Sequence, residues 1–335
     1  MTNIKKIGLS ALAGALAMTS AHAGAVSMTG SMEVSYTNGG GYASNTGNSL
    51  GQNNELTFTA STELDNGVTV AYKNTATDTA LGNDSELVFG NILGGTLAFQ
   101  STGSPLDGID NKTPTAFKDA EGMVGSITDV SGPSGDFGIR YTLSDVAGTG
   151  FKIDYNYVPK FGTGDATGDE ATGAGTGQGN KNSHDIAITG SVPGVEGLNV
   201  GFGYAVYNYD KADNVSDINE RHDGTVYATY AVGPVTLGAQ LGGRADAFSG
   251  NNYKNKYFGI SYAVSDDLSV SYNNTTSRKA GGAHTFSPIQ QEWDGVSASY
   301  SMGGMTLNIA DTDCSNCSYG SNSQDETTIS MTIAF

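Results

Sequence analysis

The chain has 335 residues and a formal net charge of -18, with 34 acidic and 16 basic side chains. This balance argues against nucleic acid as a partner, because phosphate contacts need a basic surface. Mean hydropathy is polar at -0.26, and no apolar run of ~18 residues follows residue 24, which excludes transmembrane helices in the rest of the chain. A transmembrane β-barrel fits this composition, since only every second residue of its strands faces lipid.

The N-terminal segment has the pattern of a secretory signal peptide. Lys5 and Lys6 form a short positive region, an apolar stretch covers residues 7–17, and Ala21-His22-Ala23 is a small-x-small cleavage site. Residues 1–23 are therefore expected to be a signal peptide that is removed after export. A transmembrane anchor is the alternative, but the apolar stretch is too short to cross ~30 Å of hydrocarbon.

Apolar residues then alternate with polar ones throughout residues 24–335, which is the pattern of β-strands with one apolar face. The segment 137–143, for example, has Phe137, Ile139 and Tyr141 with Gly138 and Arg140 between them. Sixteen such segments occur, over 28–36, 56–60, 68–72, 87–89, 97–99, 137–143, 151–157, 186–192, 198–204, 226–232, 235–241, 258–264, 268–272, 296–302, 305–309 and 329–335.

Short connections are expected to alternate with long ones. Turn-like sequences join seven pairs of segments, over 64–67, 93–95, 144–150, 193–197, 233–234, 266–267 and 303–304,. Polar, Gly-, Asn- or Asp-rich stretches form the other connections, over 38–53, 75–84, 101–136, 159–183, 210–222, 246–255, 278–291 and 312–324. This layout predicts an all-β fold: a closed antiparallel barrel of sixteen strands, with short periplasmic turns and long extracellular loops.

The lipid environment requires the sheet to close into a barrel. Every backbone group inside lipid has to be paired, so the last strand has to meet the first. A soluble all-β fold is the alternative interpretation. A β-helix would show a short fixed repeat, which is absent, and a sandwich would not require every second connection to be short.

With these features the chain resembles the general diffusion porins, and most closely the sixteen-stranded trimeric porins of alphaproteobacteria. The most specific element is the C-terminal strand 327–335, which alternates apolar residues and ends in Phe335. The resemblance implies that Phe335 is part of the signal read by the barrel-assembly machinery. It also implies a homotrimer in the outer membrane, in contact with its lipid and lipopolysaccharide, that lets small hydrophilic solutes diffuse passively.

The resemblance further implies that the longest loop, 101–136, folds into the lumen as a constriction loop. Its acidic candidates are Asp107, Asp110, Asp119, Glu121 and Asp129. Family members set such carboxylates against basic side chains on the barrel wall, and the lumen-facing basic candidates are Lys73, Arg140, Lys152 and Arg244. Opposed charges place a transverse field across the pore. The excess of acids predicts weak cation selectivity.

Cys314 and Cys317 are the only cysteines. In an exported protein such a pair more often closes a local disulfide than binds metal. No catalytic residues and no metal site are expected, because the histidines are isolated. Asp165, Asp169 and Glu170 supply oxygen ligands of the kind that calcium prefers, so structural calcium stays open, although no cofactor is expected.

Two other functions remain open. The first is a substrate-selective channel for sugars or anions, for which Tyr207, Tyr209, Tyr227 and Tyr257 are candidates for an aromatic track along the lumen. The second is a barrel whose loops act as an adhesin or an enzyme. Saturable block of the conductance by one solute favours the first, and a barrel that does not conduct favours the second.

Overall fold

The computed structural model describes residues 26–41, 48–77, 80–101, 103–121, 129–133, 136–162, 180–209, 220–246, 252–280 and 289–335. Within these ranges the side chains of residues 80–84, 119 and 121 are not described. The predicted signal peptide, residues 1–23, lies outside the described residues.

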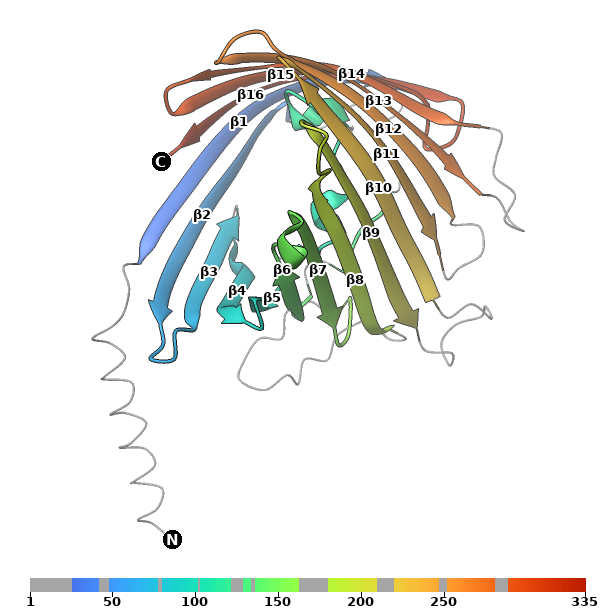
Figure 1. Ribbon diagram of the computed structural model, residues 1–335. Helices are drawn as coiled ribbons and strands as arrows, with labels where there is room; N and C mark the ends of the chain where they lie inside the picture. Colours follow the sequence, from blue (N-terminus) through green and yellow to red (C-terminus); the bar gives the residue numbers. More distant parts are fainter. Residues whose placement is uncertain are drawn as a thin grey trace, which may run out of the picture.

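Sixteen strands form the described part of the molecule (Figure 1). They are β1 (Ser27–Gly41), β2 (Leu50–Glu63), β3 (Thr69–Thr77), β4 (Ala80–Ile92), β5 (Gly95–Gln100), β6 (Gly138–Leu143), β7 (Phe151–Val158), β8 (Asn180–Ser191), β9 (Leu198–Tyr209), β10 (Glu220–Val232), β11 (Val235–Ala245), β12 (Tyr253–Ala263), β13 (Leu268–Lys279), β14 (Gln291–Met302), β15 (Met305–Cys317) and β16 (Asn322–Ala334).

The helical pieces of the described residues are three short 3-10 turns. They are η2 (Asp107–Ile109), η3 (Lys118–Glu121) and η4 (Val146–Gly148). In the part of the chain that the structure describes, no helix combines the length and the apolar character needed to cross a membrane.

Each strand pairs antiparallel with its neighbours in sequence, and β1 pairs with β16 to close the barrel. The closing seam runs from Ser31 opposite Ala334 to Gly41 opposite Gln324. Closure pairs the outer backbone groups of the first and last strands, which an open sheet in lipid would leave unsatisfied. The predicted closed antiparallel barrel of sixteen strands is confirmed.

The two faces of the wall differ as the alternation predicts. Apolar side chains such as Val226, Val296 and Ile329 face outward and are 47–51 % exposed. The intervening positions carry polar side chains that face inward and are buried, among them Gln240 and Asn273. This is the reverse of a soluble protein, and it identifies the outer face as the one that meets hydrocarbon.

Tyrosines mark the edge of the apolar outer surface on the side of the long connections. Tyr155 Oη lies 2.7 Å from His184 Nδ1, and Tyr204 Oη lies 2.7 Å from His222 Nδ1, each on the next strand. An aromatic ring with a polar tip fits the boundary between hydrocarbon and water. These tyrosines therefore mark one boundary of the apolar band on the outer wall.

Seven of the eight predicted loops are shorter than expected, and three of them shorten by half or more because the strands extend into polar sequence. β15 continues to Cys317 and β16 begins at Asn322, so the connection predicted over 312–324 is a turn of residues 318–321. Asp311, Asp313 and Asp325 are exposed on these strand extensions. A strand that rises beyond the hydrocarbon needs no apolar face, so the alternation that reveals it in sequence disappears. The predicted loops 38–53 and 75–84 shorten in the same way, to 42–49 and 78–79.

The wall is lowest at β5 and β6, which have six residues each. A strand rises ~3.3 Å per residue and tilts by ~45° in a membrane barrel, so six residues cover only ~14 Å of the ~30 Å of hydrocarbon. The loop between these two strands is the one that enters the lumen.

Candidate functional site

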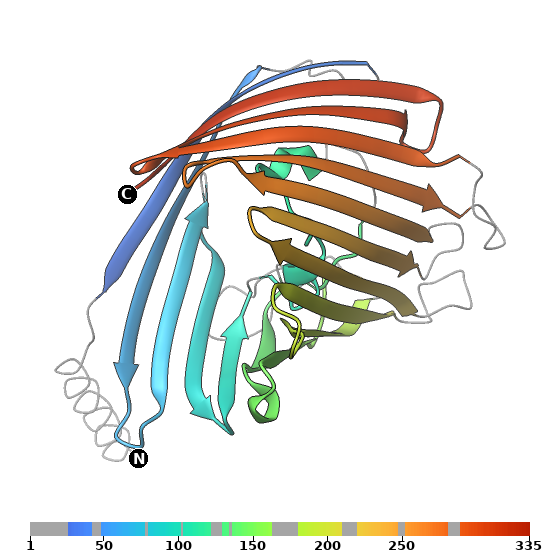
Figure 2. The ribbon, with the colours of Figure 1, turned by 45° about the horizontal axis from the view of Figure 1, so that its top comes forward.

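The connection between β5 and β6 lies inside the ring of strands, where Figure 2 shows its short helical turns. Its first part is fixed to the inner wall by two side chains. The backbone N–H of Leu106 donates to Asp185 Oδ2 on β8 over 2.9 Å. Gln240 on β11 donates to the carbonyl of Ile109 over 3.0 Å and accepts the backbone N–H of Lys112 over 2.7 Å. The loop thus follows the wall from β8 to β11.

The next part of the loop continues across β13 and β14. Asn273 Nδ2 donates to the carbonyl of Pro114 over 3.0 Å. The backbone N–H of Ala116 donates to Ser271 Oγ over 2.9 Å, and that of Phe117 donates to Ser297 Oγ over 3.0 Å. Each anchoring side chain occupies an inward position of its strand. The polar lumen face therefore satisfies loop backbone groups that water would otherwise have to solvate.

Three glycines on the inner wall allow this close approach. A Cβ atom at Gly238 would lie 2.2 Å from Pro114 Cδ, and one at Gly259 would lie 2.7 Å from the Pro114 carbonyl. A Cβ atom at Gly295 would lie 2.1 Å from the carbonyl of Ala120. All three distances are shorter than a Cβ contact permits, so the loop packs directly against bare strand backbone.

Apolar contacts inside the barrel add to these hydrogen bonds. Leu106 and Ile109 of the loop pack with Ala187, Ala205 and Val158 of the wall. Further along, Phe117 and Ala120 pack against Ala310 on β15. These clusters stand out in an otherwise polar lumen, and burying them stabilises the loop in one position, at roughly 25 cal/mol per Å² of apolar surface.

The returning part of the loop is held by a second group of side chains. Asp129 accepts hydrogen bonds from Tyr257 Oη and from Asn255 Nδ2, both on β12. The backbone N–H of Ser131 donates to Asp223 Oδ2 over 2.9 Å, and Tyr207 Oη donates to the Ser131 carbonyl over 2.6 Å.

Asp223 on β10 is the centre of an ion-pair cluster beneath this returning segment. It is fully buried and pairs with Arg221 over 2.6 Å and with Arg244 over 3.0 Å. Both arginines also reach Ser131 Oγ, and Arg244 donates to the Asp129 carbonyl. Two guanidinium groups share one carboxylate, so the cluster carries a net positive charge and binds the loop.

Asp154 on β7 forms a matching cluster near the start of the loop. It is 1 % exposed and pairs with Arg140 through two hydrogen bonds and with Lys152 over 3.3 Å. Arg140 also donates to the carbonyl of Gly103 over 3.3 Å. This cluster likewise joins two basic groups to one acid and contacts the loop.

Three loop carboxylates interact with one another. Burial, together with the charges of Asp129 and Asp107, raises the pKa of Asp110 to about 8. Burial also raises the pKa of Asp107 and of Asp129, although the hydrogen bond from Tyr257 opposes the shift of Asp129. Because like charges in a partly dehydrated site disfavour ionisation, Asp110 carries a proton over much of the neutral range.

Three of the four predicted basic candidates are paired with acidic side chains of the wall. Arg140, Lys152 and Arg244 pair with the wall carboxylates Asp154 and Asp223. Lys73 on β3 lies directly opposite Glu86 on β4. The role of these four side chains as the basic half of a constriction stays a prediction.

The other predicted residues are placed as follows. Asp119 and Glu121 belong to η3, but their side chains lie outside the described part of the structure. Phe335 follows β16 at the closing seam and exchanges backbone hydrogen bonds with Gly30. Its recognition by assembly machinery stays a prediction.

The structure joins Cys314 and Cys317 by a disulfide at the end of β15. The two cysteines pack with Trp293 on β14 in a small buried cluster.

The aromatic candidates fall into two groups. Tyr207 and Tyr257 are buried and bond to the loop, at Ser131 and Asp129. Tyr209 and Tyr227 are only partly buried and pack beside the apolar cluster around Leu106. Two of the four tyrosines therefore position the loop and do not line a path for solutes.

Among the described residues, no group of three or more His, Cys, Asp or Glu side chains is arranged to hold a metal ion. The calcium candidates Asp165, Asp169 and Glu170 lie outside the described residues.

The most consequential residues that the sequence did not single out are Asp154, Asp223 and Gln240. Each occupies an inward position of a strand, where a carboxylate or amide has to find partners once buried. The only signal for Asp223 is its spacing, since Arg221 two residues earlier shares its face of β10. Nothing in the sequence distinguishes Gln240 from other inward polar residues.

A closed barrel that is apolar outside, polar inside and narrowed by a charged loop defines a channel of the outer membrane. A family model described as Gram-negative porin matches residues 8–310. The chain therefore belongs to the Gram-negative porin family. No curated protein matches.

Solved porin structures share the fold at low sequence identity. A porin refined at 1.8 Å has a TM-score of 0.62 and 12 % identity, covering 93 % of this chain and 100 % of its own. Salmonella typhi OmpF in complex with daunomycin has a TM-score of 0.66 and 13 % identity, covering 92 % and 97 %. An anion-selective porin from Comamonas acidovorans has a TM-score of 0.64 and 13 % identity, covering 93 % and 99 %. The resemblance to the sixteen-stranded general porins is confirmed.

Proposed function

We propose that this porin forms a water-filled channel through which small hydrophilic solutes and ions diffuse passively, with a weak preference for cations. The observation that carries the proposal is the loop fixed along the inner wall with the Asp107 carboxylate partly exposed. The basic groups Arg140 and Arg244 are already paired with buried carboxylates. Loop carboxylates then act on a permeating ion with less opposition from the wall.

Reversal potentials in a salt gradient across a planar bilayer test the sign of selectivity. The expected result is a cation preference that falls in Asp107→Asn. Asp65→Asn is the matched control, because Asp65 lies in the short turn after β2 and should leave the potential unchanged. A clear anion preference of the unaltered protein contradicts the proposed selectivity without affecting the channel itself.

Anion selectivity is the second candidate, and one observation favours it. The clusters at Asp154 and Asp223 each join two basic groups to one acid, so both carry net positive charge. The anion-selective porin from Comamonas acidovorans shares the fold. The same bilayer experiment separates the two candidates by the sign of the potential. Saturable block by a single sugar would instead indicate a substrate-selective channel.

We also propose that the protein is exported by a cleaved signal peptide and assembles as a homotrimer in contact with outer-membrane lipid and lipopolysaccharide. The six-residue strands β5 and β6 support an oligomer, because so low a wall leaves part of the hydrocarbon thickness uncovered unless another subunit covers it. Crosslinking of the protein in membranes tests the number of subunits.

We further propose that the barrel-assembly machinery reads the C-terminal strand ending in Phe335. The support is its position at the closing seam, where β16 pairs with β1. Cells that express a Phe335→Ser protein should accumulate unfolded chain in the periplasm, whereas the purified variant should still fold in detergent. Equal folding defects in both settings would show that the residue acts only through stability.

A further inference from the structure

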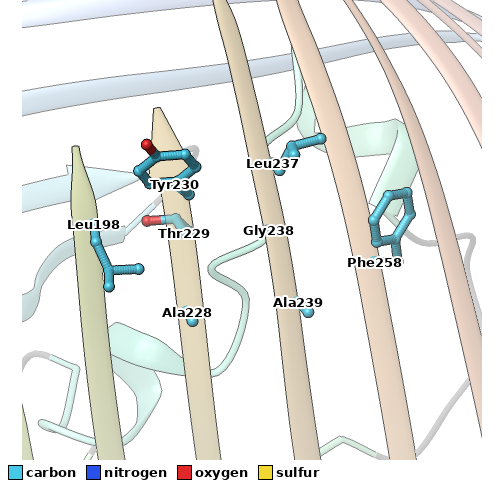
Figure 3. Close-up of a pocket in the computed structure, with 8 residues that line it drawn as sticks. All are labelled: Leu198, Ala228, Thr229, Tyr230, Leu237, Gly238, Ala239 and Phe258. Atoms are coloured by element: carbon cyan, nitrogen blue, oxygen red, sulfur yellow. The ribbon is translucent and has the colours of Figure 1, made fainter. Parts of the chain in front are cut away.

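The outer wall has an apolar hollow of about 190 Å³ between β9 and β12. Its side walls are Leu198, Tyr230, Leu237 and Phe258, as Figure 3 shows. We call this feature the outer hollow. It arises because Ala228 on β10 lies directly opposite Ala239 on β11, so that two small side chains adjoin between the four larger ones.

The outer hollow lies in the surface that faces the bilayer. Ala228, Ala239 and Phe258 are exposed on the apolar face of their strands. A depression on this face cannot stay empty at low cost, since its lining would lose dispersion contacts on one side. The occupant therefore has to be apolar and slender.

A group of basic side chains lies on the same outer face, toward the long connections. Lys256 precedes Phe258 by two residues on β12, so its Cα lies ~7 Å further along the same face. Lys254 follows in the same row, directly opposite Arg278 on β13. All three side chains are exposed. We call Lys254, Lys256 and Arg278 the basic patch.

The basic patch is unusual in a chain with 34 acidic and 16 basic side chains. None of its three members forms an ion pair with a carboxylate within the described residues. Arg278 hydrogen-bonds Gln290 Oε1 over 3.1 Å. The nearest acidic side chain by register is Glu292, opposite Thr276, and it accepts a hydrogen bond from Asn274. The patch therefore keeps its positive charge available to an outside ligand.

Leu241 connects the two features. It lies opposite Lys256 on the neighbouring strand and follows Ala239 of the outer hollow by two residues on the apolar face of β11. A molecule with an anionic head at the basic patch and a hydrocarbon chain over Leu241 would reach Ala239 directly. Neither a soluble anion nor a purely apolar protein surface uses both features.

We propose that the basic patch and the outer hollow form one binding site for an anionic, phosphate-bearing lipid of the outer leaflet. The phosphate contacts Lys254, Lys256 and Arg278, and one acyl chain occupies the hollow between Ala228 and Ala239. The proposal rests on residence in the outer membrane and not on conduction. The channel can therefore conduct normally even where the lipid site fails its test.

Native mass spectrometry of the detergent-solubilised full protein provides the test, with phosphatidylglycerol as the probe and phosphatidylcholine of the same acyl chains as the zwitterionic comparison. The expected result is a one-lipid-per-chain adduct with phosphatidylglycerol that persists under collisional activation. Ala239→Leu fills the hollow and should abolish this adduct. Lys254→Gln with Lys256→Gln should reduce it to the level seen with phosphatidylcholine.

Two matched controls separate the site from general effects. Ala298→Leu makes the same change on the outer face of β14, opposite Val270 and Ile309, and should retain the adduct. Lys254→Arg with Lys256→Arg keeps the charge and should retain it too. If Ala239→Leu does not fold, Ala228→Leu fills the same hollow from the other strand.

Three results would overturn the proposal. Equal adducts in Ala239→Leu and Ala298→Leu would show that the hollow takes no part. Displacement of the lipid by inorganic phosphate alone, with equal effect in Ala239→Leu, would show an anion site without an acyl component. A smaller oligomer in Ala239→Leu with unchanged lipid retention would show that a second copy of the chain covers the hollow.

Discussion

Gly30 and Phe335 close the barrel through a reciprocal pair of backbone hydrogen bonds, 2.8 Å from the Gly30 N–H to the Phe335 carbonyl and 2.9 Å in the opposite direction. The ring of Phe335 covers the place that a side chain at position 30 would fill, because a Cβ atom there would lie 2.7 Å from Phe335 Cε2. An aromatic ring over a strand glycine compensates for its missing side chain.

Replacement of Gly30 should therefore loosen the seam. In Gly30→Val the new side chain displaces the Phe335 ring, and the loss of the cross-strand contact should cost about 0.2–1 kcal/mol of barrel stability. The measurement is the temperature at which the folded form disappears from a semi-native gel. Phe335→Trp keeps an aromatic ring at the seam and should melt close to the unaltered protein. Unchanged melting of Gly30→Val would contradict this.

Asp223→Asn should destabilise the loop and the wall together. The substitution leaves Arg221 and Arg244 without their shared carboxylate, and breaking a buried ion pair costs about 3–5 kcal/mol. Chemical denaturation in detergent micelles should show the loss, and single-channel records should become noisier because Ser131 loses one anchor. Glu196→Gln, in the short connection between β8 and β9, is the control. Equal stability of the two variants would show that Asp223 is not the centre of this cluster.

Gly295→Val should displace the loop from the wall. Its Cβ would lie 2.1 Å from the Ala120 carbonyl. Because this contact is with backbone, no side-chain rotation can relieve the overlap and the loop has to move. Single-channel conductance should change. The susceptibility of the loop to added protease should change with it. The control is Gly304→Val, where the nearest atom to a Cβ is 3.6 Å away. A conductance change of the same size in the control would show that the effect does not depend on the loop.

Cation preference should increase with pH around the pKa of Asp110, which is about 8. Below this value the carboxyl is protonated and neutral, and above it the loop gains one negative charge. Reversal potentials recorded between pH 6 and pH 9.5 should therefore shift toward cations, and in Asp110→Asn this shift should be lost. Asp65→Asn should keep it. A pH dependence that survives in Asp110→Asn would identify another group as the cause.

The barrel was predictable from the sequence because lipid on one side and water on the other impose an alternation of period two. Residues such as Phe137, Ile139 and Tyr141 reveal this alternation directly. It vanishes at Asp311 and Asp313, where the outer face of β15 is polar and exposed, and the strand ends there were predicted wrongly. The inward fold of the loop came from family resemblance, since no local pattern distinguishes an inward loop from an outward one.

The partners of the inward side chains could not be predicted in the same way. Alternation places Arg140 and Arg244 on the lumen face but does not say whether they face open water or a buried carboxylate. That outcome depends on the cross-strand register, which sets Asp223 directly opposite Arg244. It also depends on a loop segment 115 residues away in sequence, because Arg244 bonds to the carbonyl of Asp129. Tyr257 was assigned to the lumen correctly by phase, yet the returning loop covers it.

Trp293 gives the molecule an optical property of its own. It is the single tryptophan of the chain, and it packs against Cys314 and Cys317, whose disulfide is an efficient quencher of indole fluorescence at contact distance. The tryptophan fluorescence of the protein therefore reports on the contact between β14 and β15. It is weak while Trp293 packs against the intact disulfide. Folding into vesicles can be followed in real time without attaching a dye.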